Sequence, residues 1–428
     1  MIVGLAFLWA SLLGGQESRP VLIGNHPAVF SSEGILKPWT TWDDALHREM
    51  AWYRNCPKDG KFARCVSVTF MDGKYERVAR RKDSIPAMQC ATGILSYLGY
   101  DQYINGSEPW VIDRAREFAD YIIEDASTPD GIQWPLFPRS TGKPGAFPQT
   151  PDCGSQSDHA YEVEPDKGGL FGYALVKLWE KTKEPAYLDR AVKIAQTLAD
   201  HMGEGSKAQS PWPFRVDYRT GDARGLVSAD MGYPLALFDA LGTAGHPEFK
   251  PTEEKLWAWI KRYQLPSAKG DGKLWVAFFE DYDMESNRNS WSATNLARIL
   301  MDRKEAIDHD WLGDSRVLID YATAHFVSIH NGVPVCGEQD DDMDPWGGAL
   351  TNYGSCLAMY AKASGNPAYK SLARQALNFA MYAIDDDGCP GQCALYKSRG
   401  GWQEDAHTDV IHNFMDALTA FPEWATER

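Results

Sequence analysis

The chain has 428 residues and a formal net charge of −16, and it contains sixteen tryptophans. A chain of this length can bury a large core within one domain. The acidic balance argues against nucleic acid or an anionic membrane as a partner.

The N-terminal segment IVGLAFLWASLLGG, residues 2–15, is almost entirely apolar. It is too short to span a bilayer and is typical of the core of a secretory signal, although no Lys or Arg precedes it. We therefore predict residues 1–20 as a signal segment of a secreted or periplasmic protein. The alternative is a segment that docks on the folded domain, which we expect to comprise residues 21–428.

One amphipathic helix recurs along the chain. KEPAYLDRAVKIAQTLADHM, residues 183–202, has a near-copy in GNPAYKSLARQALNFAMYAI, residues 365–384. Both carry Pro-Ala-Tyr and then apolar residues at helical spacing, which predicts one buried stripe on each helix. Looser copies continue the series. The resulting outer helices are expected near 42–55, 109–124, 185–202, 251–264, 314–328 and 368–384.

A second kind of helix is expected ahead of each amphipathic one. KGGLFGYALVKLWEK and PWGGALTNYGSCLAMYAK are examples, and both are apolar almost all round and rich in glycine. A helix of this composition suits a position enclosed by neighbours. We predict inner helices near 84–99, 167–182, 229–243, 290–303, 345–364 and 405–420.

Six helices of each kind are the number that closes an α/α toroid. An open solenoid of helical hairpins is the alternative, since stacked repeats usually do not close. Tetratricopeptide-like arrays have shorter repeats, whereas long connectors interrupt every unit here. The predicted fold class is therefore all-α, an (α/α)6 toroid of about twelve helices with short extended segments in the connectors.

The connectors that follow the outer helices also resemble one another. Each reads as a turn followed by a short, aromatic-rich extended segment. These segments are DGIQWPLFPR from Asp130, SPWPFRVDYR from Ser210, DGKLWVAFF from Asp271, NGVPVCGEQ from Asn331 and DGCPGQCALY from Asp387. Because all of them lead towards inner helices, they are expected to line one mouth of the toroid, where function would be carried.

This repeat architecture, together with the Asp-Gly-x-x-Trp type of connector, resembles the six-hairpin glycosidase-like superfamily from about residue 40 to the C-terminus. That group includes inverting glycoside hydrolases, unsaturated glucuronyl hydrolases and, in related toroids, uronate polysaccharide lyases. The resemblance implies a carbohydrate site at the mouth into which the inner-helix N-termini point. It supplies no catalytic signature that matches residue by residue.

Aromatic and basic side chains of the connectors are candidates for binding a sugar. Aromatic rings pack against the apolar faces of sugars, and arginine can hold a uronate carboxylate with two hydrogen bonds. The alternatives are core packing for each Trp and salt bridges to nearby carboxylates for each Arg. The substrate-binding candidates are Trp134, Trp212, Arg215, Tyr218, Arg288, Trp291, Trp346, Trp402 and His407.

Acidic residues recur at the expected starts of inner helices, where an Asp commonly caps free N–H groups. The same placement would hold several carboxylates around one cavity, as glycoside hydrolysis requires. In a hydrolase, the acid/base pair would come from Asp166, Asp230, Asp283 and Asp342. This is the favoured interpretation, because carboxylates at the mouth outnumber histidines.

A polysaccharide lyase is the second interpretation. There, an arginine would neutralise the uronate carboxylate while a His and a Tyr move the protons. The candidates are His159, Tyr161, Arg215 and Tyr218. A non-catalytic glycan-binding helical scaffold is a third interpretation, and an epimerase or isomerase on the same toroid is a further enzyme option.

No metal signature such as HExxH occurs in the sequence. Asp281, Asp283 and Glu285 alternate as calcium ligands can, but the glycine and the terminal Glu of an EF-hand are missing. We expect no cofactor, with calcium as an option. An oligo- or polysaccharide is the expected partner of a monomer or small homo-oligomer.

Overall fold

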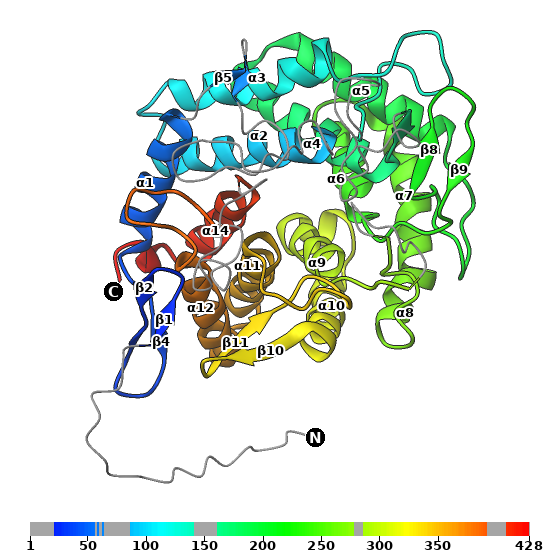
Figure 1. Cartoon of the computed structure of the whole chain (residues 1–428). Helices are drawn as coiled ribbons and strands as arrows, with labels where there is room; N and C mark the ends of the chain where they lie inside the picture. The colour runs from blue at the N-terminus through cyan, green and yellow to red at the C-terminus, as the bar shows by residue number, and fades with distance from the viewer. Residues whose placement is uncertain are drawn as a thin grey trace.

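The computed structural model describes residues 21–55, 58–59, 62–63, 86–140, 161–277, 286–391 and 408–427. In this part of the chain the helices form two concentric layers around a common axis (Figure 1). The predicted signal segment, residues 1–20, lies outside the described residues.

Six helices form the inner layer of the described structure, and each contacts the next around the ring. The last of them also contacts the first, so the ring is closed. The predicted (α/α)6 toroid is therefore confirmed and the open solenoid is excluded. The inner helices are α2 (Pro86–Tyr103), α4 (Pro165–Thr182), α6 (Gly232–Thr243), α9 (Trp291–Arg303), α11 (Gly347–Ser364) and α14 (Thr408–Ala420).

The outer layer contains the predicted amphipathic helices, which turn their apolar stripes towards the inner ring. Pro185 and Pro367 are the first residues of two of them, where a missing N–H leaves no hydrogen bond unmade. The outer helices are α1 (Trp42–Asn55), α3 (Trp110–Glu124), α5 (Pro185–Asp200), α7 (Lys250–Trp259), α10 (Trp311–Phe326) and α12 (Pro367–Met381). Helix α7 continues through a π-helical turn (Ile260–Gln264) into α8 (Leu265–Ala268).

The two ends of the chain meet to close the outer layer. No outer helix follows α14 in the described residues, and α1 packs beside it instead. The Trp42 ring of α1 lies 5.1 Å from the Phe414 ring of α14 and 5.4 Å from that of Trp424. Its indole N–H donates to Oδ1 of Asn378 in α12 at 2.9 Å. This fully buried side chain therefore joins the first outer helix to the last three elements of the described part of the chain.

Glycines let neighbouring helices approach one another closely, as two positions illustrate. A Cβ on Gly169 of α4 would lie 2.6 Å from the backbone nitrogen of Pro234 in α6. One on Gly354 of α11 would lie 2.6 Å from Cγ of Leu377 in α12. A larger residue would force the Pro234 backbone or the Leu377 side chain to shift, which explains why glycine occurs at these two positions.

Short strands occur in the connectors, as predicted. Three form an antiparallel sheet in the order β7 (Glu162–Val163), β8 (Arg215–Asp217) and β9 (Ala223–Arg224). A hairpin joins β10 (Val327–His330) to β11 (Val333–Cys336). Its two loop residues, Asn331 and Gly332, have φ values of 51° and 80°, as the Asn-Gly turn favours.

Further short strands precede α2. They pair as the hairpins β1 (Leu22–Ile23) with β2 (His26–Pro27), β3 (Val29–Phe30) with β4 (Leu36–Lys37), and β5 (Lys58–Asp59) with β6 (Phe62–Ala63). The first of these is tied to the end of α12 by a hydrogen bond between Nε2 of His26 and the carbonyl of Ile384 at 2.9 Å.

The two faces of the toroid differ in the length of their connectors. Residues 183–184 join α4 to α5, and residues 365–366 join α11 to α12. In contrast, residues 201–231 lead from α5 to α6, and residues 327–346 lead from α10 to α11. We call the face with the long connectors, at the N-terminal ends of the inner helices, the mouth, and the opposite face the back.

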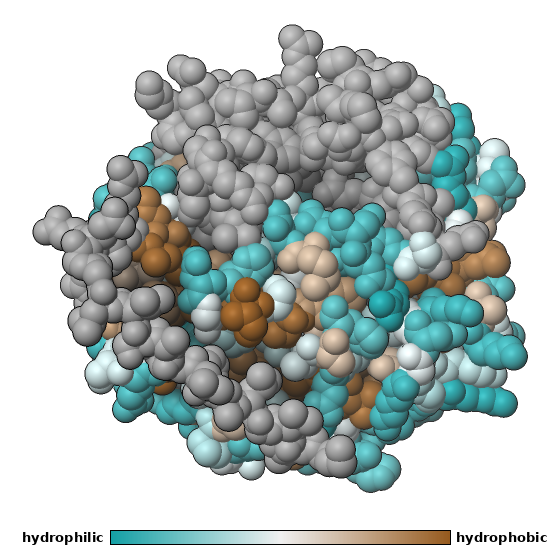
Figure 2. Space-filling view, turned by 60° about the horizontal axis from the view of Figure 1, so that its bottom comes forward, coloured by the Kyte–Doolittle hydropathy of each residue, from teal (hydrophilic) through white to brown (hydrophobic). Residues whose placement is uncertain are grey.

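Figure 2 shows a face of the molecule on which hydrophilic residues dominate the coloured part, with smaller hydrophobic areas between them. None of the helices in the described ranges has the length and hydrophobicity needed to cross a bilayer.

Candidate active site at the mouth of the toroid

A buried ionic cluster lies where the inner helices α4 and α6 begin. The ammonium of Lys167 is 2.8 Å from Oδ2 of Asp166 and 2.5 Å from Oδ2 of Asp230. The hydroxyl of Ser228 donates to the same oxygen of Asp166 at 2.6 Å. None of the three charged side chains has more than 1% of its surface exposed. We call these four residues the Lys167 cluster.

Charge pairing is what makes this burial tolerable. Burial alone would lower the pKa of Lys167, but Asp166 and then Asp230 outweigh it and raise that pKa above its ordinary value. The lysine is therefore charged at every physiological pH. Two buried carboxylates that share one ammonium are held in place, and removing the ammonium would leave both without their main partner.

A second buried group lies beside the first on the sheet β7–β8–β9. Nε of Arg215 is 2.8 Å from Oε1 of Glu164 and 3.9 Å from Oε2 of Glu162. Nε of Arg224 is 3.2 Å from the other oxygen of Glu162. Burial raises the pKa of Glu164 to about 8, although Arg215 and Lys167 oppose it. Its Oε2 atom has no hydrogen-bond partner among the described residues.

The expected helix caps take a different form. The residues at the N-cap positions of α4, α6 and α11 are Glu164, Met231 and Trp346, and none of them makes a side-chain cap hydrogen bond. The N-cap positions are therefore not held by the predicted aspartates Asp166 and Asp230. Both Asp166 and Asp230 bind the Lys167 ammonium, and Oδ1 of Asp166 also accepts the backbone N–H of Lys167 in the first turn of α4 at 2.8 Å.

An accessible acidic group occupies the loop between β11 and α11. Asp342 is half-buried, and burial raises its pKa, while the backbone N–H of Asp344 and the neighbouring Trp346 side chain oppose the rise. The Asp344 N–H donates to Oδ1 of Asp342 at 3.1 Å. In the part of the chain described here, Asp342 makes no ion pair. Asp342, Asp344 and Trp346 are called the Asp342 site.

The loop that carries the Asp342 site is anchored to the start of α9. Arg288 binds Asp340 through Nε at 2.8 Å and through Nη2 at 3.0 Å. The Asn287 side chain donates to Oε1 of Gln339 at 2.9 Å. Arg288, a predicted substrate ligand, therefore follows the salt-bridge alternative, as does Arg215. Both arginines hold connectors of the mouth together.

Two predicted tyrosines are neighbours on the sheet edge. The rings of Tyr161 and Tyr218 are 5.9 Å apart, edge to face, and the Arg219 guanidinium lies 3.3 Å from the centre of the Tyr161 ring. Arg219 is also paired with Asp217 at 2.6 Å. Burial raises the pKa of Tyr218 above its ordinary value.

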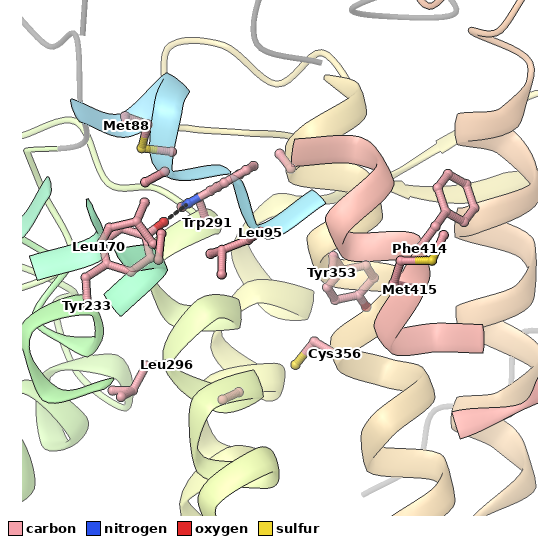
Figure 3. Close-up of a cluster of buried hydrophobic side chains, with 14 of the residues drawn as sticks. Met88, Leu95, Leu170, Tyr233, Trp291, Leu296, Tyr353, Cys356, Phe414 and Met415 are labelled. Atoms are coloured by element: carbon pink, nitrogen blue, oxygen red, sulfur yellow. Dashed lines mark hydrogen bonds between the residues drawn. The ribbon is translucent and has the colours of Figure 1, made fainter. Parts of the chain in front are cut away.

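Most of the predicted tryptophans that the structure describes are packed inside. Trp212 is fully buried and donates its indole N–H to the carbonyl of Leu198, and Trp134 stacks on His201 with ring centres 4.4 Å apart. Trp291 donates to the Tyr233 hydroxyl at 2.8 Å across the inner ring (Figure 3). These three follow the core-packing alternative. Trp346 is half-buried and retains an accessible surface.

The remaining predicted site residues cannot be placed. His159, Asp283, Trp402 and His407 lie outside the described residues. So does the acidic run 281–285 that was considered for calcium. Within the described ranges, no group of three or more His, Cys, Asp or Glu side chains is arranged to hold a metal ion.

Lys167 is the central residue that the sequence analysis missed. A usable signal was present, since a lysine in the first turn of an inner helix that is otherwise apolar must find anionic partners when buried. The sequence does not show that one of these partners would be Asp230, which reaches Lys167 from the connector just before α6.

Comparisons with known proteins agree with this architecture. No protein-family model and no curated protein sequence matches the chain. Among solved structures, the cellobiose 2-epimerase of Spirochaeta thermophila DSM 6192 superposes with a TM-score of 0.64 at 11% identity, covering 89% of this chain and 95% of its own. The chain has the six-hairpin (α/α)6 toroid fold.

Other six-hairpin enzymes superpose in the same way. A family 76 glycoside hydrolase from a bovine Bacteroides thetaiotaomicron strain has a TM-score of 0.59 at 12% identity, with coverage of 90% of this chain and 78% of that one. A polysaccharide lyase has a TM-score of 0.57 at 12% identity, with coverage of 89% and 53%. At identities this low, the structural similarity shows the fold alone. The reaction must therefore be argued from the site.

Proposed function

We propose that the protein is a glycoside hydrolase that cleaves an oligo- or polysaccharide at the mouth of the toroid. The observation that carries this proposal is the Asp342 site, where an accessible carboxyl group with a raised pKa lies next to a second carboxylate and a half-buried indole ring. Structural neighbours that act on carbohydrates support a sugar as the substrate.

In the proposed reaction, Asp342 is the general acid. A raised pKa keeps part of its population protonated, so that it can donate a proton to the glycosidic oxygen as the bond to the anomeric carbon breaks. Asp344 accepts a proton from the water that attacks that carbon. The Trp346 ring offers a surface for the apolar face of a sugar.

The Lys167 cluster has a positioning role in this proposal. Asp166 and Asp230 were expected to be catalytic, but each binds the Lys167 ammonium and is shielded from solvent. A carboxylate in that state is poorly suited to exchange protons with a substrate. We infer that the cluster fixes the N-terminal ends of α4 and α6 relative to each other.

A specific observation also favours elimination as a second candidate. Tyr161, Tyr218 and Arg219 lie together beside the sheet β7–β8–β9, and this set contains a proton carrier and a cation for a uronate carboxylate. In such a lyase, Tyr218 would act on the proton next to the carboxylate. The engagement of Arg219 with Asp217 makes this candidate the weaker of the two.

The reaction class is tested by incubating the purified full chain with neutral and uronate-containing glycans. Reducing ends, ultraviolet absorbance and proton NMR spectra of the products are measured in parallel. New reducing ends without absorbance are expected for hydrolysis. Absorbance from an unsaturated uronate would instead favour the lyase, and a changed sugar configuration without chain cleavage would point to epimerisation and overturn the proposal.

A further inference from the structure

A cavity opens at the back of the toroid, away from the Asp342 site. Its outer part has a volume of about 790 Å³ and lies between the C-terminal ends of α2, α4 and α14. An inner part of about 230 Å³ extends along α4, α6 and α9 towards Tyr233. Both parts are lined by Leu95, Tyr173, Lys177 and Asp416, so they adjoin each other. We call this space the back cavity.

The cations that line the back cavity are each paired with a carboxylate. Lys181 lies 2.5 Å from Asp101, and Lys177 lies 2.8 Å from Glu180. Arg298 lies 2.5 Å from Asp416, and Arg303 pairs with Asp239. These four pairs balance one another in charge. A ligand that carries a large net charge would gain little from such a lining.

Two polar groups on the walls of the inner part remain open to a ligand. In the described part of the chain, the Asp302 carboxylate forms no hydrogen bond or ion pair, and the Tyr173 hydroxyl forms no hydrogen bond. Asp302 is exposed at the end of α9, and Tyr173 is half-buried in the middle of α4. The carboxylate can accept hydrogen bonds from hydroxyl groups, while the phenol can both donate and accept.

The surroundings of Asp302 do not favour a cationic ligand in particular. Arg303 and Lys177 lie close enough to act on the carboxylate, and their charges oppose those of Asp416 and Asp239. The remaining wall includes the apolar side chains of Leu95, Leu170 and Met359. Open acceptors and donors next to apolar surface, with Asp302 as the single charge left unpaired among the described residues of the inner part, match the chemistry of a polyol.

We propose that the back cavity is a second binding site for a small neutral polyhydroxylated molecule, of the size of a mono- or disaccharide. Asp302 and Tyr173 would bind its hydroxyl groups, and the Leu95 side chain would contact its apolar face. This proposal does not depend on the reaction at the mouth, because no residue of the Asp342 site lines the cavity.

Calorimetric titration of the full chain with D-mannose and with cellobiose tests the proposal. The titrations use the Asp342→Asn background to prevent turnover, with and without Asp302→Ala or Tyr173→Phe. Each added change should weaken one saturable binding event roughly tenfold, the loss expected for a hydrogen bond to a sugar hydroxyl. Asp320→Ala, an exposed aspartate on the outer helix α10, is the matched control and should leave that event unchanged.

Two outcomes would overturn the proposal of a second binding site. One is the absence of saturable binding by either sugar, and the other is binding that neither Asp302→Ala nor Tyr173→Phe weakens. If only the proposed hydrolase were wrong, the parent protein would show no turnover, but sugar binding at the back cavity would still be detected. Urea unfolding of each variant shows whether a loss of sugar binding is caused by a loss of folding.

Discussion

Lys167 and Lys177 belong to the same helix, α4, but they lie on opposite faces of the toroid. At the mouth, Lys167 is fully buried between two carboxylates. Towards the back, Lys177 pairs with Glu180 in a setting where both side chains keep about a third of their surface exposed, 29% and 35%. The two lysines of this helix therefore have different roles. At the mouth, buried charge fixes backbone elements, whereas the Lys177–Glu180 pair at the back stays partly exposed beside a cavity.

Replacing Lys167 with Met should have the largest effect on stability. The change leaves Asp166 and Asp230 buried without their shared cation, and breaking a buried ion pair in this way costs about 3–5 kcal/mol. Urea unfolding followed by tryptophan fluorescence measures the loss. Lys193→Met, at an exposed position on α5, is the control and should unfold like the parent protein. A loss for Lys167→Met of less than about 1 kcal/mol would show that the cluster is not a structural anchor.

The Glu164 carboxyl should make stability depend on pH. Its pKa in the folded protein is about 8, against an ordinary value of 4.5, so the folded state holds an extra proton between these values. The stabilisation is therefore complete below about pH 4.5 and is lost as the pH rises towards 8, by at most about 1.4 kcal/mol per pH unit.

Comparison with Glu164→Gln isolates this contribution, because the amide does not titrate. The difference in unfolding free energy between parent and variant should shift in favour of the variant as the pH rises through this range. Glu254→Gln, at an exposed site on α7, should give no such trend. Parallel stability curves for the parent and Glu164→Gln would contradict the assignment.

Lys177→Met should have the smallest effect on stability. Exposed pairs three residues apart on a helix contribute about 0.5 kcal/mol or less. The same urea experiment applies, and the Lys167→Met result serves as its reference. A loss as large as that of Lys167→Met would remove the contrast between the two faces.

The helices could be predicted from the sequence because each repeat carries its own periodic signal. The expected outer helix at 42–55 coincides with α1, and the inner helix expected at 290–303 differs from α9 by one residue at its start. Ring closure also followed from local information, since six hairpins of this kind suffice to return the chain to its beginning.

The candidate site could be predicted only in part, because its contacts join distant segments. Asp166 and Asp230 were singled out individually, but their meeting at Lys167 depends on how α4 packs beside α6. Trp212 and Trp346 look alike in sequence, and only the packing around them separates a buried ring from an accessible one. The back cavity has no local signature, since its walls come from several inner helices.

The most direct test of the central claim compares turnover by Asp342→Asn and Asp341→Asn on the glycan that the parent protein cleaves. Asp341 is the exposed neighbour in the same loop, so both variants lose one negative charge at nearly the same place. We predict that Asp342→Asn lowers kcat/KM by about 10²–10⁴-fold, the usual contribution of a general acid, while Asp341→Asn stays close to the parent. Equal turnover by the two folded variants would contradict the assignment of Asp342 as the catalytic acid.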